Sequence, residues 1–455
     1  MAARHRIQNR AELLGVEEPT RARRQRALEL CERLLDSLDP YEATRRSLRA
    51  VFPRGICNGR SHVLAIGKAA VAMARAALDE VGARSGFVLA PEPASEDLSP
   101  LILLRGGHPS PCAEAPAHAQ QVLAHLQRLG AGEQLLCLIS GGGSALFELP
   151  RAGLRLEDLA RTGELLMHGG ASIQALNLVR RSLSQVKGGG VLRACPNLAV
   201  TNFILSDVVG GPLYAVASGP TLPIHDPSAN PLALLEDFGV RSATPGAVIA
   251  LLEADARRAH PSSAGTERLQ ATERRFSPPN MRIPAATPPT WVVADNDRAV
   301  RLVEQHASDL GLALQVLPGH LEGDAATAGA GLSTRFRGGG TGSFVWGGET
   351  TVRIDAPNPG RGGRNQELIL GAARSALAHG SFSGTLVALG SDGVDGRSPA
   401  AGALLDAEVL QRLSLTDVEA ALDGHDSYTL LEGAGAALIT GPTGTNVADL
   451  CFWLA

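Results

Sequence analysis

Short apolar runs that alternate with helical stretches constrain the fold of this chain more than any other feature. The runs SHVLAIG, GFVLA, LILLRGG and EQLLCLIS are typical of buried strands, and helical periodicity is present from Lys68 to Leu78 and through AEAPAHAQQVLAHLQRL. This alternation predicts an α/β fold with a mostly parallel sheet and helices on both faces. Glycines directly follow three of the strands, at the carboxyl ends where such sheets bind ligands: Gly67, Gly106 and Gly141.

The pattern is interrupted once, which predicts two domains. Residues 20–50 are expected to form a helix within a first domain, 1–255. Residues 256–288 are rich in Arg, Pro, Ser and Thr and lack periodicity, so we expect a linker or mobile loop there. A second, smaller α/β domain over 289–455 is predicted to contain the strands TWVVA, GSFVWGG, TVRID, GTLVALG and ALITG and the helix NQELILGAARSAL.

Composition excludes several classes of protein. The 455 residues carry a net charge of −4 without a block of like charge, so we expect neither nucleic-acid nor membrane partners. No apolar run reaches the ~18 residues that span a bilayer. The six cysteines form no C-x-x-C pair, which favours buried free thiols and, together with the polar first residues, a cytoplasmic location.

Lysine usage is the most informative part of the composition. Only two of the 42 lysine and arginine residues are lysines, Lys68 and Lys187, and both lie beside glycine. Lysine differs from arginine in being a compact charge on a flexible stem. We therefore expect Lys68, and with less force Lys187, to have a function, although survival of two surface lysines by chance is the alternative.

The segment LLCLISGGGSAL predicts an anion-binding turn. An apolar strand runs into three glycines, and the exposed N–H groups of such a turn attract phosphate or carboxylate. The alternative is a tight turn without a ligand. The GK[ST] ending of a Walker loop is missing. The predicted binding residues are Ser140, Gly141, Gly142, Gly143 and Ser144.

Two further segments of the first domain carry candidate ligand contacts. Asn177 and Arg181 share one face of a predicted helix that we expect to continue to Lys187, where a polar stripe suits an anion or is simply a solvated face. His108, in the turn GGHPSP, is expected either to orient a substrate hydroxyl or to bond locally. Asp207 follows the strand NFILS and either binds Mg²⁺, accepts a proton or caps a turn.

The second domain adds polar glycine turns. Arg364 precedes a predicted helix, where a guanidinium can brace a phosphoryl group and Asn365 can serve as helix cap. Asp392 and Asp395 follow a strand and are weak candidates for Mg²⁺ ligands. The same group of turns supplies the remaining predicted substrate or nucleotide contacts: Glu349, Asn365, Glu367, Thr443 and Asn446.

Taken in order, these motifs resemble one family. AIGKAAVAMA, GGHPSP, LISGGGSAL, GASIQALNLVRRSLSQVKGG, LSDVVGGPLYAVASGPT, GGETTV, GGRNQEL, GSDGVDG and TGPTGTNVADL are similar to the glycerate 2-kinases that end in a MOFRL domain. The resemblance covers residues 25–450 apart from the linker.

The resemblance implies a function and a site. It implies a Rossmann-like N-terminal domain, a MOFRL-type C-terminal domain and an active site in the cleft between them, with a homodimer as one expected assembly. It also implies phosphorylation of the 2-hydroxyl of D-glycerate by ATP with Mg²⁺, to give 2-phosphoglycerate. Lys68 and Arg364 are the implied catalytic residues, and Asp207 would bind metal or take the hydroxyl proton.

The chain departs from the family pattern in three places. Gly211 and Ala175 stand where an acid is expected, and Ala294-Asp295-Asn296 replaces Gly-Ser-Asn. The lost carboxylates leave open a catalytically weakened hydroxy-acid sensor or a kinase for another hydroxy acid. A hydroxypyruvate reductase is a further alternative, but the G-x-G-x-x-G turn of a nicotinamide enzyme is missing.

Overall fold

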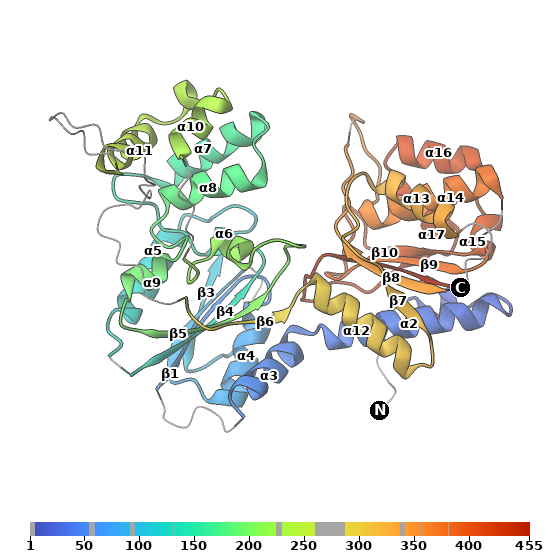
Figure 1. Cartoon of the computed structure of the whole chain (residues 1–455), viewed down its shortest axis with the longest axis horizontal. Coiled ribbons are helices and arrows are strands. Elements are labelled where there is room, and N and C mark those ends of the chain that lie inside the picture. The colour runs from blue at the N-terminus through green and yellow to red at the C-terminus, as the bar shows by residue number, and fades with distance from the viewer. Residues whose placement is uncertain are drawn as a thin grey trace, which may run out of the picture. The chain divides into compact units, whose positions relative to one another are not determined.

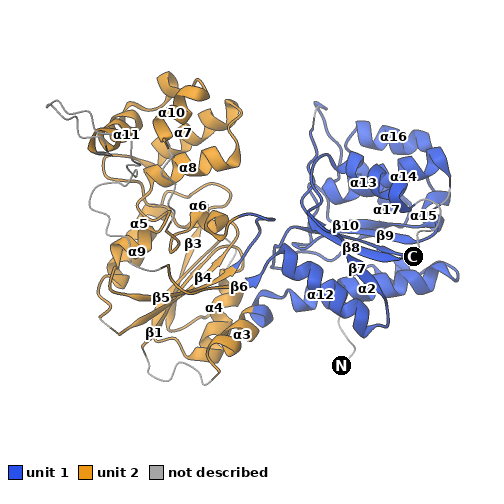
Figure 2. Ribbon diagram, in the orientation of Figure 1, with its two compact units in different colours: residues 1–43, 205–211, 292–455 blue, residues 44–204, 212–291 orange. Residues whose placement is uncertain are grey.

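The computed structural model describes most of the chain in two compact units. The described residues are 5–53, 60–91, 96–130, 132–223, 230–259, 287–336, 342–354, 356–380 and 382–455. Unit 1 comprises residues 1–43, 205–211 and 292–455, and unit 2 comprises residues 44–204 and 212–291 (Figure 2). This division differs from the predicted domains, because the first 43 residues and residues 205–211 belong to the unit that contains the C-terminal sheet.

Unit 2 is organised around a six-stranded sheet in the order β3-β2-β1-β4-β5-β6 (Figure 1). β1 pairs in parallel with β2 and with β4, and β2 pairs in parallel with β3. This is the strand order of a Rossmann fold, so the predicted sheet is confirmed. The strands are β1 (Ser61–Ile66), β2 (Ser85–Pro91), β3 (Leu101–Gly106), β4 (Gln134–Ser140), β5 (Ala199–Leu205) and β6 (Thr290–Ala294).

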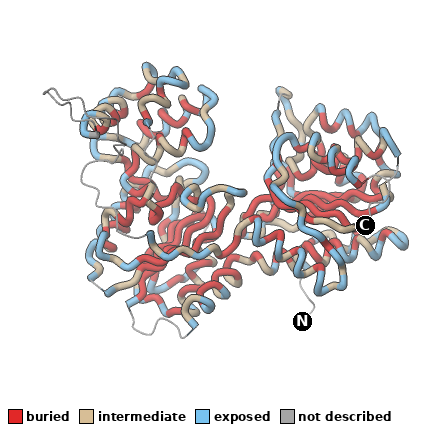
Figure 3. The backbone as a smooth tube through the Cα atoms, viewed as in Figure 1, coloured by how far each residue is buried: buried red, intermediate tan, exposed pale blue. Residues whose placement is uncertain are grey.

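The continuous apolar runs of this sheet reflect burial on both faces. Every residue of β1 is buried, and β4 is buried beyond its first residue (Figure 3). The helix predicted from residue 68 is α4 (Ala70–Val81), which links β1 to β2. The other helices of this part of the chain are α3 (Pro40–Val51), α5 (Ala115–Leu126), α6 (Gly143–Leu146), α7 (Leu156–His168), α8 (Ile173–Leu183), α9 (Gly190–Ala194), η1 (Leu213–Ser218), α10 (Pro231–Asp237), η2 (Arg241–Ala243) and α11 (Gly246–Ala259).

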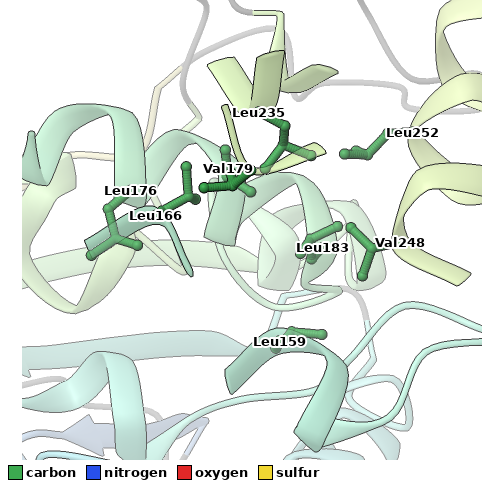
Figure 4. Close-up of a cluster of buried hydrophobic side chains, with 9 residues drawn as sticks. Leu159, Leu166, Leu176, Val179, Leu183, Leu235, Val248 and Leu252 are labelled. Carbon is green, nitrogen blue, oxygen red and sulfur yellow. The ribbon is translucent and has the colours of Figure 1, made fainter. Parts of the chain in front are cut away.

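Four helices of unit 2 form a small core of their own. Leu166 of α7, Val179 of α8, Leu235 of α10 and Val248 of α11 belong to one buried apolar cluster (Figure 4). Leu166 and Leu235 are fully buried, at 0% exposure. This core holds α8, and with it the polar residues on that helix, in a defined position.

Unit 1 contains a second six-stranded sheet, in the order β11-β10-β9-β12-β8-β7. β12 is antiparallel to both β8 and β9, β10 is antiparallel to β9 and β11, and β7 is parallel to β8. The strands are β7 (Leu314–Val316), β8 (Ser343–Gly348), β9 (Thr385–Gly390), β10 (Gly402–Leu405), β11 (Ala437–Leu438) and β12 (Asp449–Leu454). The helices are α1 (Arg10–Leu13), α2 (Thr20–Ser37), α12 (Asn296–Asp309), α13 (Ala325–Phe336), α14 (Arg364–His379), α15 (Ala407–Gln411), α16 (Leu415–Asp423) and α17 (Ser427–Gly433).

A buried ion pair fastens the N-terminal segment into unit 1. Arg24 of α2 donates from Nε and Nη2 to the two carboxylate oxygens of Asp406, at 2.6 and 2.9 Å, and from Nη1 to the carbonyl oxygen of Leu13 at 2.8 Å. The side chains of Arg24 and Asp406 are 1% and 0% exposed. A charge pair this deeply buried must keep its partner, which accounts for the place of α2 in this unit.

Three predicted elements differ from the structure. The helix predicted over 20–50 is two helices, because Pro40 starts α3 after a break at Leu38 and Asp39. TVRID does not form the predicted strand: Thr351 makes an isolated bridge with Asp324, residues 352–354 are irregular, and Asp355 lies outside the described residues. The predicted linker 256–288 starts inside α11, and its residues 260–286 lie outside the described residues.

Among the described residues, no helix combines the length and the apolar character that a membrane span requires.

Replacing Arg24 with Met tests the anchoring role of the buried pair. The variant leaves Asp406 buried without its countercharge, so we expect the free energy of unfolding to fall by roughly 3–5 kcal/mol. Urea denaturation measures the change. As a control, Arg6→Met removes solvent-accessible pairs with Asp36 (2.7 Å) and Asp39 (3.4 Å) and should cost no more than about 1 kcal/mol. Equal losses in the two variants would contradict the anchoring role.

Candidate active site

The strand order places two glycine turns side by side in unit 2. β1 and β4 are neighbours, and β1 leads out to β2 and β3 whereas β4 leads to β5 and β6 on the other side. Open α/β sheets bind ligands at such a switch point, beyond the carboxyl ends of the strands. Gly67 and Lys68 follow β1, and Gly141 to Ser144 follow β4, so both predicted turns lie there.

The first turn needs glycine because the two chain segments almost touch. Gly67 has a φ of +122°, and an added β-carbon would lie 2.3 Å from Oγ of Ser140. Ser140 is buried, and its hydroxyl accepts from the N–H of Ala69 at 3.1 Å and donates to the carbonyl of Ile66 at 3.3 Å. Lys68 N–H donates to the carbonyl of Gly141 at 2.9 Å. Ser140 therefore joins the turns to each other rather than facing solvent.

Lys68 and His108 converge over the second turn. Both are exposed, and a β-carbon added at Gly142 would lie 2.8 Å from Cδ2 of His108 and 3.1 Å from Cγ of Lys68. Partial burial lowers the pKa of His108, and the positive charge of Lys68 lowers it further. The turn thus presents one cationic side chain beside an imidazole that is neutral at pH 7.

Lys187 has a different place from the one predicted. α8 ends at Leu183, so Lys187 lies beyond the helix and is only 2% exposed. Its ammonium donates to the carbonyls of Ser144 (2.7 Å) and Phe147 (3.3 Å) and pairs with Glu148 at 2.8 Å. All three contacts lie on the segment that follows the glycine turn, so Lys187 stabilises the conformation of that segment.

Hydrogen bonds connect a third loop, around Ser218, to the glycine turn and to the segment after Lys187. Oγ of Ser144 lies 3.0 Å from Oγ of Ser218, and the N–H of Gly188 donates to the carbonyl of Ser218 at 2.9 Å. Ser218 has a φ of +59°, a conformation that a serine adopts only when its surroundings enforce it. Sequence analysis missed both Ser218 and Glu148. The SGP signal at Ser218 marks a turn but does not show which segment the turn contacts.

The polar residues predicted on α8 keep their positions there. Asn177 and Arg181 are half-buried, and the guanidinium carbon of Arg181 lies 5.7 Å from the ring centre of Tyr214. Ala175, where an acid was expected, is buried on the same helix, and its N–H donates to the capping hydroxyl of Ser172.

In unit 1, Arg364 is held by two carboxylates. It is the first residue of α14. Its Nε and Nη2 donate to the two oxygens of Asp449 at 2.5 and 3.1 Å, and its Nη1 donates to Oε1 of Glu349 at 2.6 Å. Burial lowers the pKa of Arg364, but Asp449 and Glu349 more than offset this and raise it. Arg364 is therefore permanently charged, and its direction is set mainly by the bidentate contact.

Asp449, which sequence analysis did not select, is the fixed member of this group. It begins β12, which is paired on both sides, and its carbonyl accepts from Nδ2 of Asn296 at 3.0 Å. Burial raises the pKa of Asp449 to about 6, and Arg364 partly offsets that rise. Its only sequence signal was a lone carboxylate at the start of the apolar run LCFWL.

A small cavity of about 10 Å³ lies beside this group, about the size of a single water. Its walls are formed by residues of β8, β12 and α14, among them Asn365 and Asp449, and by Leu321 and Thr350.

The carboxylate of Asp395 caps α14. It accepts from the backbone N–H groups of Asn365 (3.1 Å) and Gln366 (2.9 Å) and from Nε2 of Gln366 (2.9 Å), and it is 2% exposed. The sequence predicted Asn365 as the helix cap, but the side chain that caps α14 is that of Asp395. Both oxygens of Asp395 already accept protein hydrogen bonds, which favours a structural role over metal binding.

The other predicted residues of unit 1 mostly shape their own turns. Oδ1 of Asp392 accepts from Val394 N–H at 3.2 Å, and the hydroxyl of Thr443 donates to the carbonyl of Ser391 at 2.6 Å. Oδ1 of Asn446 accepts from Ala448 N–H at 2.9 Å.

Two predicted acids have separate surroundings. Glu367 is buried and pairs with Nδ1 of His425 at 2.9 Å; burial raises its pKa and His425 partly offsets the rise. Asp207 is half-buried, four residues before Gly211. A β-carbon at Gly211 would lie 2.4 Å from Cγ1 of Val208, so the local packing suits glycine where an acid was expected. Within the described ranges, no three His, Cys, Asp or Glu side chains gather as a metal site.

The chain is thus a two-unit α/β protein, with a Rossmann-order sheet whose switch point carries glycine turns and a second, mixed sheet. Residues 26–253 match the family described as "Domain of unknown function (DUF4147)", and residues 342–449 match the MOFRL family.

Known proteins identify the family. The chain is 32% identical to the glycerate 2-kinase of Pyrococcus horikoshii, over 94% of this chain and 96% of that protein. It is 32% identical to an Agrobacterium vitis protein provisionally named a hydroxypyruvate reductase, over 91% of this chain and 90% of that protein. A crystal structure of glycerate kinase from Thermotoga maritima superposes with a TM-score of 0.80 and 30% identity, covering 94% of this chain and 98% of that one. The chain belongs to the glycerate 2-kinase family, in which a DUF4147 domain and a MOFRL domain occur together.

Replacing Lys187 with Met tests whether this lysine supports the glycine turn. The change leaves Glu148 buried without its partner, and we expect the free energy of unfolding to fall by roughly 3–5 kcal/mol. The double variant Lys187→Met/Glu148→Leu removes both charges and should recover much of that loss. Urea denaturation of the three proteins measures both effects. If Lys187→Met is as stable as the wild type, Lys187 does not stabilise this turn.

The raised pKa of Asp449 predicts a pH effect on stability. Burial raises the pKa of Asp449 in the folded protein to about 6, above the ordinary aspartate value of 3.8. This group therefore favours folding below about pH 4, and the contribution is lost as the pH rises through about 6. Relative to Asp449→Asn, the wild type should lose about 2 kcal/mol of unfolding free energy between pH 4 and pH 7. Urea titrations at pH 4, 5, 6 and 7 measure this; a difference that does not change with pH would contradict it.

Proposed function

We propose that this protein is a glycerate 2-kinase that transfers the γ-phosphoryl group of ATP to the 2-hydroxyl of D-glycerate, with Mg²⁺. The observation that carries the proposal is the lysine at the switch point, Lys68, in a chain that shares nearly its whole length with a glycerate 2-kinase. In the reaction, the bond between the γ-phosphorus and the bridging oxygen of ADP breaks. A bond from that phosphorus to the 2-oxygen forms, and the hydroxyl proton passes to a base.

Lys68 is proposed to neutralise the transferring phosphoryl group. Phosphoryl transfer depends mainly on positioning and on compensating charge on the phosphate oxygens. Lys68 is exposed, lies next to a glycine turn and has a mobile ammonium, which suits this task. His108 is proposed to orient the substrate hydroxyl, because its lowered pKa keeps a neutral nitrogen available as a hydrogen-bond acceptor.

The glycine turn is proposed to approach the substrate with its backbone. Gly141, Gly142 and Gly143 carry no side chains that would keep an anion away from their N–H groups. Ser140 and Lys187 are proposed to position this turn, because their polar atoms are committed to protein partners. Contacts of Ser144, Asn177 and Arg181 with substrate or nucleotide are part of the same proposal.

In unit 1, Arg364 is proposed to brace the phosphoryl group or the glycerate carboxylate. The proposed proton acceptor is Asp207, on the half-buried segment after β5. Contacts of Asn365, Glu367, Thr443 and Asn446 with substrate or nucleotide also remain proposals. Mg²⁺ is commonly held by one or two carboxylates together with substrate phosphates. Asp392 is the proposed protein ligand, and binding of the ion by Asp207 is the alternative to its role as proton acceptor. When bound, the ion would offset the charge of the phosphate oxygens.

A hydroxypyruvate reductase is disfavoured as the second candidate. A nicotinamide enzyme of this fold needs a G-x-G-x-x-G turn after its first strand, and the turn after β1 reads Gly67-Lys68-Ala69-Ala70. A cytoplasmic location also remains a prediction. It is supported by the free thiols of the five cysteines within the described ranges: Cys31, Cys112, Cys137, Cys195 and Cys451. The predicted homodimer remains a prediction as well.

Release of ADP from ATP and Mg²⁺ tests the proposal. We expect D-glycerate, but not hydroxypyruvate with NADH, to support turnover by the wild type. Lys68→Ala should lower kcat on the order of 10²- to 10³-fold, because a donor to the transition state is lost. Arg161→Ala, which removes an exposed charge on α7, should retain wild-type rates. Folded wild type that binds D-glycerate without releasing ADP would exclude the kinase and favour the sensor.

A further inference from the structure

Arg364 contacts two carboxylates that differ in how firmly they are held. Asp449 accepts two hydrogen bonds from the guanidinium, and its side chain is 10% exposed. Glu349 accepts one hydrogen bond, and its side chain is 45% exposed. The two contacts therefore have different strengths, because exposed single ion pairs contribute little and bidentate buried pairs contribute more.

Asp449 is unable to leave Arg364 at low cost. Its backbone lies in β12 between β8 and β9, and Asn296 donates to its carbonyl at 3.0 Å and to that of Val447 at 2.8 Å. Moving this carboxylate would leave a charge buried without a partner, which proteins avoid.

Glu349 is free to leave by rotating its own side chain. It follows the end of β8, and its long side chain is exposed, so the solvent can replace the contact with Arg364. With both acids in place, the three side chains carry a net charge of −1, which repels a further anion. The acids use three of the five N–H donors of Arg364, and an anion that takes the Nη1 donor now used by Glu349 must displace that side chain.

We infer that Glu349 occupies the anion position on Arg364 and is displaced by the oxyanion of the substrate, while Asp449 stays in place and orients the guanidinium. This inference rests on the proposed function and deepens it. Glu349 then acts against substrate binding, unlike the direct contact predicted from the sequence. The oxyanion is the carboxylate of glycerate or a phosphate of ATP, since the planar fork of arginine accepts both.

Calorimetric titrations of the full chain with D-glycerate alone and with MgATP alone test the inference without requiring turnover. Glu349→Gln removes the competing charge and should tighten binding of one of these ligands by about two- to fivefold. The ligand that responds identifies the anion. Glu29→Gln is the matched control, because it removes a partly exposed glutamate paired with Arg33 at 2.7 Å in the same unit, and it should leave both affinities unchanged.

Asp449→Asn separates positioning from competition. It should weaken binding of the ligand that Glu349→Gln tightens and should lower kcat, whereas Glu349→Gln should lower KM for that ligand and leave kcat within about twofold. Circular dichroism verifies that both variants are folded. If Asp449→Asn does not fold, the result for Glu349→Gln still tests the inference.

Unchanged or weaker binding of both ligands to Glu349→Gln would overturn the inference. The proposed function fails separately: wild type that releases no ADP while Glu349→Gln binds D-glycerate more tightly would remove the kinase and keep the displacement. Wild type that releases ADP with D-glycerate, combined with unaltered affinities in Glu349→Gln, would keep the kinase function and remove the displacement of Glu349.

Discussion

The close approach of the β1 and β4 turns is the constraint on which the candidate site depends. The hydroxyl of Ser140 joins the two strand ends, and Gly67 is the residue that lets the chains approach within hydrogen-bond distance. A side chain at Gly67 would overlap Ser140, and the turn that carries Lys68 would have to move. The position of the lysine is therefore a consequence of backbone geometry, including the bond from its own N–H to the carbonyl of Gly141.

The two lysines show how one residue type serves two physical purposes. Lys68 is exposed over the turn, whereas the ammonium of Lys187 is buried and contacts Ser144, Phe147 and Glu148. An ammonium suits both places because it is small and donates in three directions. The buried lysine organises the segment after the glycine turn, beside the turn over which the exposed lysine lies.

Arg364 illustrates a different solution to the same problem of holding a cation in position. Its bidentate bond to Asp449 fixes the plane of the guanidinium, and its second bond to the exposed Glu349 leaves one edge exchangeable. Asp395 contributes indirectly, because it caps α14 through the N–H groups of the two residues that follow Arg364. The strength of these contacts decreases from the buried side of the group to the exposed side.

The fold class, the parallel sheet of unit 2 and the turns in which Lys68, His108 and Arg364 lie could all be predicted from the amino-acid sequence. Local hydrophobic periodicity and glycine position carry that information, because they act on neighbouring residues. Three features became visible only in the folded chain: residues 5–43 belong to the unit of the C-terminal sheet, Lys187 is buried against Glu148, and Asp449 holds Arg364. Lys187 and Glu148 are 39 positions apart in the chain, and Arg364 and Asp449 are 85 positions apart. Whether a charged residue faces solvent, a ligand or a countercharge depends on which distant segment folds over it. The pattern of charges along the sequence does not specify that choice.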